Sequence, residues 1–331
     1  MVVEQAQTRA HTLSVGITYF GEADLLTRCI LSLLNGSAQP DEILVYDDAS
    51  PIPAERFIPR HADVRVIRGE INTGVSFSRN QLMQESNCDY IRFHDADDPF
   101  HPEWCATIYK TINDSTPDVI ITGLRVQRDG VFIRSGFLDS LKKFPQTDDL
   151  TLMALRYGPA TQEVTLKRRL GLDVGGFRSR IEPAEDSEFF IRLAFASKTY
   201  VFVDAPVALR ELRPNSLSLD ENNESRIEYI SARYQMARLL VNDLPQTYHD
   251  ELAEMVARTA VAAATLGEYE LAKRGVALAA SIGNVSYKYY SGIQRFLIRM
   301  AGPVNAGIII RHYRRRVPPV LRRSVRRVRF A

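Results

Sequence analysis

The sequence predicts an α/β protein with a mostly parallel sheet flanked by helices, followed by a C-terminal helical region. β-type runs at 13–19, 42–46 and 64–67 alternate with helical patterns, and a fourth run ends at Asp95. Strands that alternate with helices of this length pair in parallel through right-handed crossovers. From about residue 223 to 280 the apolar spacing is helical. Ligands are therefore expected along the carboxyl ends of the strands.

Local signals justify the other elements. Asn35-Gly36 closes the first helix, and Arg128-Asp129-Gly130 is typical of a hairpin turn. Helical spacing of apolar residues predicts helices at 22–34, 76–86, 102–113, 149–157 and 185–196. β-branched and apolar runs predict further strands at 118–124, 131–134, 163–166, 200–203 and 207–210.

Composition and charge bound the class of protein. The chain has 331 residues, 45% hydrophobic and 25% charged, as expected for a soluble globular protein. No uninterrupted apolar segment reaches the ~18 residues of a membrane span, and we expect no signal peptide. The three cysteines have no paired spacing, which argues against a disulfide framework or a zinc site. These features favour a reducing, cytoplasmic environment.

The charge is unevenly distributed along the chain. The net charge is +2, yet no Asp or Glu follows residue 270, so residues 271–331 carry +14 and the preceding residues −12. We therefore expect three parts: an α/β domain at 1–220, a helical extension at 221–285 and a basic amphipathic tail at 286–331. The acidic body and the basic tail should have different partners.

The stretch Ile91–Pro99 ends a predicted strand in three carboxylates, those of Asp95, Asp97 and Asp98. Carboxylates so close together repel one another, so a divalent cation or a hydroxyl-rich ligand among them would stabilise the cluster. A solvated acidic turn is the alternative, because Asp and Pro are ordinary loop residues.

Five motifs follow one another between residues 12 and 218. They are Ile17-Thr18-Tyr19-Phe20, Asp47-Asp48-Ala49-Ser50, Asn72-Thr73-Gly74 with Arg79-Asn80, Asp95-Ala96-Asp97-Asp98, and Glu185-Asp186. In the order and approximate spacing of these motifs, the chain resembles the family 2 glycosyltransferases, inverting enzymes that use nucleotide-activated sugars. The resemblance implies a GT-A type, Rossmann-like sheet.

The resemblance also implies donor-binding residues. Thr18 and Phe20 would meet the nucleobase, where the aromatic ring could cover it; core packing is the alternative for Phe20. Asp48, with Asp47 beside it, would accept a hydrogen bond from the base, unless the pair only forms a strand-end turn. Arg79 would lie near the diphosphate, or else be an exposed helix residue without a role.

The acidic cluster matches the DxD motif of the family. Asp95 would point toward the ribose and Asp97 toward a metal ion. Hard carboxylate and phosphate oxygens suit Mn²⁺ or Mg²⁺, which would bridge the diphosphate and stabilise the leaving group.

Asp186 resembles the family's catalytic base, which takes the proton of the acceptor hydroxyl. Glu185 would tune that base or contact the acceptor, although both carboxylates also favour a helix N-terminus through its dipole. Many family members carry a histidine where this chain has Arg213. An arginine cannot ligate a cation but can pair with phosphate.

The basic tail combines aromatic and apolar residues at helical spacing in 287–300 with arginines between 311 and 329. Basic amphipathic segments of this kind bind anionic bilayers. We expect peripheral attachment to the inner face of the cell membrane, near a lipid-linked acceptor, and no nucleic-acid partner. A nucleic-acid surface and a solvated or partner-binding helix are the alternatives.

The resemblance predicts a hexosyltransferase type of enzyme. It would move a sugar from a uridine diphosphate sugar to a hydroxyl of a glycan or lipid-linked acceptor in surface polysaccharide synthesis. A non-catalytic scaffold that retains the fold is the alternative, which loss of Asp97 or Asp186 would have favoured. A nucleotidyltransferase would carry a glycine-rich phosphate loop, but Gly21-Glu22-Ala23-Asp24 has one glycine.

Overall fold

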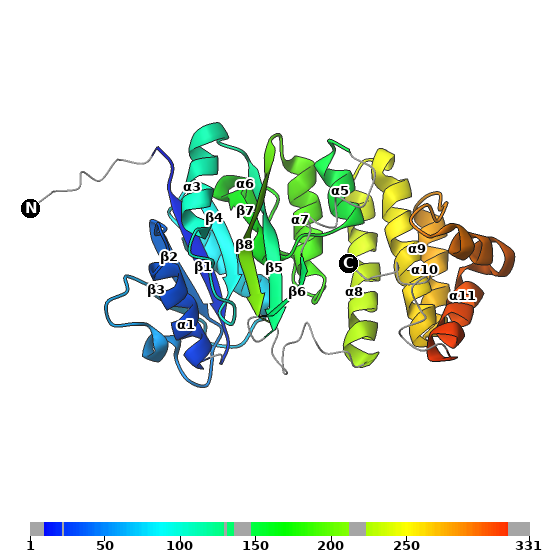
Figure 1. Ribbon diagram of the computed structural model, residues 1–331, viewed down its shortest axis with the longest axis horizontal. Helices are drawn as coiled ribbons and strands as arrows, with labels where there is room; N and C mark the ends of the chain where they lie inside the picture. The colour runs from blue at the N-terminus through cyan, green and yellow to red at the C-terminus, as the bar shows by residue number, and fades with distance from the viewer. Residues whose placement is uncertain (1–9, 22, 129–130, 136–146, 212–222, 317–331) are drawn as a thin grey trace, which may run out of the picture. The chain divides into compact units, whose positions relative to one another are not determined.

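The computed structural model describes residues 10–21, 23–128, 131–135, 147–211 and 223–316 (Figure 1). The chain forms two compact units that interleave along the sequence. Unit 1 comprises 1–146, 159–179 and 196–218, and unit 2 comprises 147–158, 180–195 and 219–331. The domain boundary expected after residue 220 lies next to the last of these divisions, and the one expected after 285 lies inside unit 2.

Unit 1 is built on an eight-stranded sheet in the order β3-β2-β1-β4-β7-β5-β6, with β8 paired to β5. β1 is parallel to β2 and β4, β2 is parallel to β3, and β5 is parallel to β8. β7 is antiparallel to both β4 and β5, and β6 is antiparallel to β5. The strands are β1 (Leu13–Tyr19), β2 (Glu42–Asp47), β3 (Arg65–Arg68), β4 (Tyr90–Asp95), β5 (Val119–Arg128), β6 (Val131–Ser135), β7 (Val164–Lys167) and β8 (Tyr200–Glu211).

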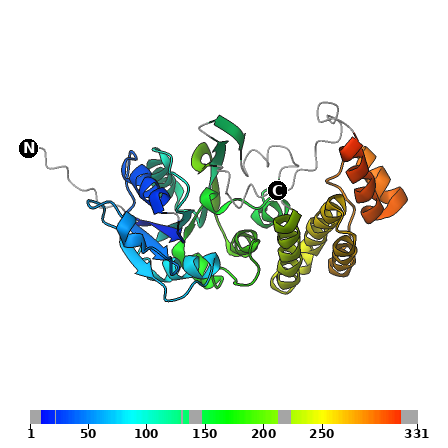
Figure 2. The same ribbon diagram turned by 90° about the horizontal axis from the view of Figure 1, so that it is seen from below.

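Two layers of helices cover this sheet. The core on one face packs β1, β2 and β4 against α1 and α3, with Val15, Ile17 and Trp104 fully buried. On the other face a Cβ at Gly16 would lie 3.1 Å from Leu82, so α2 packs closely on β1 there (Figure 2). The helices of unit 1 are α1 (Ala23–Leu34), η1 (Ala54–Phe57), α2 (Val75–Glu85), α3 (Trp104–Ser115), η2 (Thr161–Glu163) and α6 (Arg168–Asp173).

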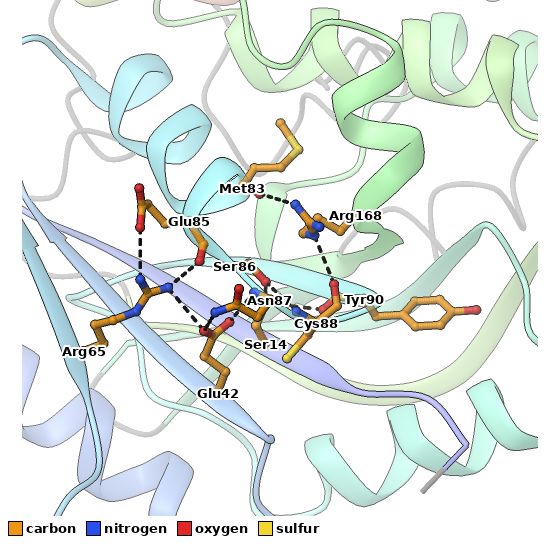
Figure 3. A network of polar contacts seen from close by, with 10 residues as sticks. All are labelled: Ser14, Glu42, Arg65, Met83, Glu85, Ser86, Asn87, Cys88, Tyr90 and Arg168. Atoms are coloured by element: carbon orange, nitrogen blue, oxygen red, sulfur yellow. Dashed lines mark hydrogen bonds and ion pairs between the residues drawn. The ribbon is translucent and has the colours of Figure 1, made fainter.

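A polar network closes the amino ends of the strands, at the edge opposite Asp95 (Figure 3). Arg65 donates to the Glu85 carboxylate at 3.0 Å and to Glu42 at 3.3 Å, and Glu42 accepts from the Asn87 backbone N–H at 3.1 Å. Arg168 donates to carbonyl oxygens at the C-terminal end of α2 and after it. These contacts fix the C-terminal end of α2. The carboxyl ends of the strands, on the opposite side, are left for ligands.

Unit 2 is helical, which confirms the predicted C-terminal helical region. α9 is its central helix. The small buried residues of α9 let neighbouring helices pack closely against it: a Cβ added at Gly307 of α11 would lie only 2.4 Å from the Ala264 Cβ of α9. Non-helical Gly302 and the following Pro303 interrupt α11. Apart from the last residue of α7, unit 2 holds α5 (Leu150–Arg156), α7 (Glu185–Ala196), α8 (Asn223–Asp243), η4 (Gln246–Tyr248), α9 (His249–Leu266), α10 (Tyr269–Ile282) and α11 (Gly292–Arg316).

The predicted elements agree with the described ones to within a few residues, with one exception in the strands. The runs at 200–203 and 207–210 form a single strand, β8, because both pair with β5 across a register shift between Thr122 and Leu124. The predicted turn residues 129–130, Glu22 and the tail beyond residue 316 lie outside the described residues. Among the described helices, none combines the length and the apolarity that crossing a membrane requires.

Candidate active site

Three carboxylates gather where β4 ends. Asp95 is the last residue of β4, opposite Thr18 of β1, and Asp97 and Asp98 follow in the turn. One oxygen from each of the three lies within 4.8 Å of the others, and among the described residues this is the one such group that could hold a metal ion. Asp95 and Asp97 are partly exposed, whereas Asp98 is 3% exposed. The donor set fits a hard divalent cation, which prefers carboxylate oxygens.

Asp95 is held from both sides. The Arg79 guanidinium donates to its Oδ1 at 3.1 Å, the Thr18 hydroxyl reaches the same oxygen at 3.5 Å, and the Gln162 amide donates to Oδ2 at 2.8 Å. Burial alone would raise the pKa of Asp95, but the charges of Arg79 and Arg210 outweigh it and lower that pKa. Asp95 is therefore a carboxylate of fixed orientation and full negative charge.

Asp98 has a different environment. Its Oδ2 accepts from the Gln162 amide at 3.0 Å and its Oδ1 from the Glu211 backbone N–H at 2.9 Å. Burial and the neighbouring Asp97 charge raise the pKa of Asp98 to about 7, although Arg210 opposes the rise. Asp98 is also almost fully buried, whereas Asp95 and Asp97 are partly exposed, so an incoming ligand reaches Asp95 and Asp97 first.

The alternatives that the sequence left open for Phe20 and Arg79 are not supported. Phe20 is 49% exposed after β1, so it does not pack in the core. Arg79 is buried in α2, pairs with Asp95 and lies 5.3 Å from the centre of the Phe177 ring. Arg79 is therefore part of the acidic cluster's surroundings.

Asp47 and Asp48 lie at the end of β2, and both are buried. Asp47 accepts hydrogen bonds within the turn that follows β2, whereas Asp48 accepts from the backbone N–H groups of Thr73 and Gly74 at 2.9 and 2.8 Å. Gly74 is the N-cap of α2 and has φ 91°. Asp48 thus ties the Asn72-Thr73-Gly74 loop to the strand ends, and its contact with a nucleobase stays a prediction.

The candidate base Asp186 belongs to unit 2, in the first turn of α7. Its carboxylate accepts from the Ser187 backbone N–H at 2.6 Å, and the side chain is partly exposed. Glu185 is buried, and Glu188 forms a bidentate pair with Arg192, both bonds 2.6 Å long. Unit 1 thus brings together Thr18, Arg79, Asp95 and Asp97, while Asp186 and Glu185 lie in unit 2 and Arg213 lies outside the described residues.

The sequence from β1 to β6, which includes the acidic cluster, matches a known family. The model of glycosyl transferase family 2 matches residues 14–161. The chain carries a family 2 glycosyltransferase domain. The glycosyltransferase is 25% identical to an uncharacterized glycosyltransferase of Haemophilus influenzae over 232 residues, covering 67% of this chain and 76% of that one. It is also 25% identical over 202 residues to protein MT1568 of Mycobacterium tuberculosis, covering 56% of this chain and 62% of the relative.

Solved structures share the fold of the glycosyltransferase. Staphylococcus aureus TarS 1–349, in complex with UDP-GlcNAc, superposes with a TM-score of 0.62 at 17% identity, covering 92% of this chain and 91% of that one. The mannosyltransferase PcManGT of Pyrobaculum calidifontis, in complex with GDP-Man and Mn²⁺, gives 0.57 at 17% identity, covering 93% and 88%. At this identity the likeness concerns the fold alone, and it confirms the predicted GT-A architecture.

Three residues around the acidic cluster of the glycosyltransferase were not predicted: Gln162, Arg210 and Arg92. Gln162 and Arg210 come from η2 and β8, far from the DxD motif in sequence, and no local pattern marks them. Arg92 did have a signal, a cation between the apolar strand residues Ile91 and Phe93. Its buried guanidinium lies 4.6 Å from the Trp104 ring centre, and burial lowers its pKa to about 9, so it remains a cation at neutral pH.

Proposed function

We propose that the glycosyltransferase uses a nucleotide diphosphate sugar, preferably a uridine diphosphate sugar, and inverts the anomeric carbon. The observation that carries the proposal is the group of three carboxylates within 4.8 Å at the end of β4, with a buried arginine beside it. Two fold relatives support it, because TarS is known with UDP-GlcNAc and UDP, and PcManGT with GDP-Man and Mn²⁺.

Asp97 would hold a divalent cation, Mn²⁺ or Mg²⁺, with Asp95 beside it in the same carboxylate group and also directed toward the ribose of the donor. Such an ion neutralises the diphosphate as the bond to the sugar breaks. Arg79, in contact with Asp95, would add positive charge near the phosphates. Arg213, which is not among the described residues, would also pair with the phosphates.

Thr18 lies near the end of β1, opposite Asp95, and Phe20 directly follows that strand; a nucleoside would lie there. The exposed ring of Phe20 offers a face for stacking on the base. Asp48, with Asp47, would shape the base pocket through the loop that it holds and would accept from the base N–H. Asp186 would take the proton of the acceptor hydroxyl, with Glu185 next to it, so that the oxygen attacks opposite the leaving nucleotide.

The acceptor would be a hydroxyl of a glycan or lipid-linked sugar used for surface polysaccharide. α11 supports a location on a membrane surface, because Ile293, Phe296 and Met300 are 70%, 62% and 72% exposed on one side of it. Exposed Arg295 and Arg299 lie on a neighbouring side. These exposed apolar and basic residues, and the lack of any acidic residue in the sequence after 270, fit attachment to the inner, anionic face of a membrane.

A donor screen tests the proposal. The full chain is incubated with Mn²⁺ or Mg²⁺, a panel of nucleotide sugars and membrane lipid extract, and the released nucleoside diphosphate is measured. We expect one donor to react in a metal-dependent way. Asp97→Ala and Asp186→Asn should each lower turnover about 100-fold or more, since both remove groups that act in the transition state.

Asp63→Asn, a change at an exposed acidic residue of unit 1, is the control and should keep full turnover. A donor that reacts equally well with Asp97→Ala or without metal would disprove the metal role. A chain that releases no nucleotide from any donor would favour the scaffold alternative.

A further inference from the structure

Gln162 bridges two of the three carboxylates. It lies in η2, directly before β7, the strand that inserts antiparallel between β4 and β5 (Figure 1). The side chain is fully buried. Its Nε2 donates to Asp95 Oδ2 at 2.8 Å and to Asp98 Oδ2 at 3.0 Å. One amide group thus satisfies an oxygen of each carboxylate at once.

Arg210 of β8 fixes the orientation of that amide. Its Nη2 donates to Gln162 Oε1 at 2.7 Å, and its Nε lies 3.9 Å from Asp98 Oδ2. A guanidinium has only donors, so it must face the amide oxygen. The Gln162 NH₂ group is then left to face the carboxylates, and the amide cannot turn over without placing a donor against a donor.

The contacts of Gln162 counter a repulsion inside the cluster. Carboxylates this close in a partly buried site repel, and without donors they would separate or take up protons. Asp95 is held by Arg79 on one oxygen and Gln162 on the other, and Asp98 by Gln162 and the Glu211 N–H. The positions of both carboxylates are therefore set by the protein before any ligand arrives.

We propose that Gln162 is a positioning residue of the glycosyltransferase, which acts through Asp95 and Asp98 to hold the acidic cluster ready for a divalent cation. The proposal rests on the metal-dependent function proposed above. Hydrogen-bond partners of metal ligands typically contribute about 10–100-fold to metal affinity or activity. Loss of the Gln162 amide should fall in that range.

The test measures Mn²⁺ binding directly, by titration of the full chain followed by the signal of free Mn²⁺, and separately determines kcat and KM for the donor. Gln162→Met keeps the length of the side chain without its donors. We expect about 10-fold weaker Mn²⁺ binding and a lower kcat, with a smaller change in the donor KM. A melting curve confirms that the variant is folded.

Gln127→Met is the matched control, because Gln127 donates at 2.8 Å to the Glu211 side chain and to neither carboxylate. It should bind Mn²⁺ like the unmodified chain. If Gln162→Met does not fold, Gln162→Asn is used instead; its amide is one methylene shorter and cannot reach both aspartates.

Folded Gln162→Met or Gln162→Asn with unchanged Mn²⁺ affinity and kcat would overturn the positioning role. Failure of the proposed function looks different, because then the unmodified chain itself neither binds Mn²⁺ nor releases nucleotide from any donor.

Discussion

Single buried carboxylates hold the turns at the carboxyl ends of the strands. Asp47 is fully buried and accepts from the backbone N–H groups of Ser50 at 2.7 Å and Ala54 at 2.9 Å, as well as from the Arg68 guanidinium. Charge-assisted bonds of this kind are about twice as strong as neutral ones. The turn after β2, and with it the neighbouring Asp48, is therefore rigid.

Asp47→Asn tests this anchor. Asparagine keeps one acceptor oxygen but turns an NH₂ group toward a donor, so a buried group loses its partner. We expect the free energy of unfolding to fall by about 1–3 kcal/mol, measured by urea denaturation. Glu55→Gln, at an exposed position in η1, should change it by less than about 0.5 kcal/mol. Equal midpoints for the two variants would contradict the assignment.

At the scale of elements, α2 is hydrogen-bonded to the loop that precedes α7. The Asn80 side chain donates to the Phe177 carbonyl at 2.8 Å and accepts from the Phe177 N–H at 2.7 Å. It thus pairs with both backbone groups of Phe177, as a residue of a neighbouring β-strand would. The preceding Gly176 has φ +66°, and a Cβ there would lie 2.3 Å from Asn80 Oδ1. This contact sets the Phe177 ring against Arg79, and through Arg79 it supports Asp95.

Alanine substitutions at two adjacent glycines distinguish the cost of backbone strain from the cost of disturbing the contact between Asn80 and Phe177. Gly175 has φ +84° with open space around it, so Gly175→Ala should cost only the left-handed strain of about 1–2 kcal/mol. Gly176→Ala adds a clash with Asn80 and should lower the melting temperature several degrees further. It should also weaken donor binding. Identical melting temperatures would show that the Asn80 contact contributes nothing.

The sequence was enough to predict elements whose signals are local. The alternation of strands and helices up to Asp95, and the acidic edge itself, followed from short-range spacing and strand-end chemistry. The position of β7 did not, because its pairing joins Tyr90 to Lys167 and leaves no pattern in either segment. β8 was predicted as two strands, since Asp204 and Pro206 interrupt its apolar run.

The same distinction holds for the candidate site. Asp95, Asp97 and Asp98 were predicted as a group because they are neighbours in sequence. Gln162 and Arg210 could not be, because their roles depend on tertiary contacts that bring η2 and β8 close to the turn after β4. That Asp98 binds protein donors with both oxygens likewise follows from tertiary contacts alone.

At the scale of the whole molecule, the charge is divided between a negative N-terminal body and a positive C-terminal region. Unit 1 lies within the part that carries −12, whereas residues 271–331 carry +14. The exposed apolar side of α11 belongs to the positive part. We therefore predict that attachment to a bilayer depends on α11 and on anionic lipid.

Vesicle sedimentation measures this attachment. The full chain should bind vesicles with anionic phosphatidylglycerol and not neutral phosphatidylcholine, and about 0.5 M salt should release part of it. The triple change Ile293→Ser, Phe296→Ser and Met300→Ser should lower binding at least several-fold. Ile71→Ser is the control, because Ile71 is 70% exposed in unit 1. Equal loss in the control, or no loss in the triple variant, would exclude α11 as the contact.

The strands of unit 1 do not leave the ribosome in the order in which they pair. β4 emerges with β1 available on one side, but its other edge has no partner until residues 164–167 have been made. β5 lacks its partner β8 for longer still, until residues 200–211 have been made. Open edges of this kind are templates for mispairing during synthesis. A nascent chain that ends at residue 161 contains the whole family match, yet the strand that carries Asp95 is still an edge in it.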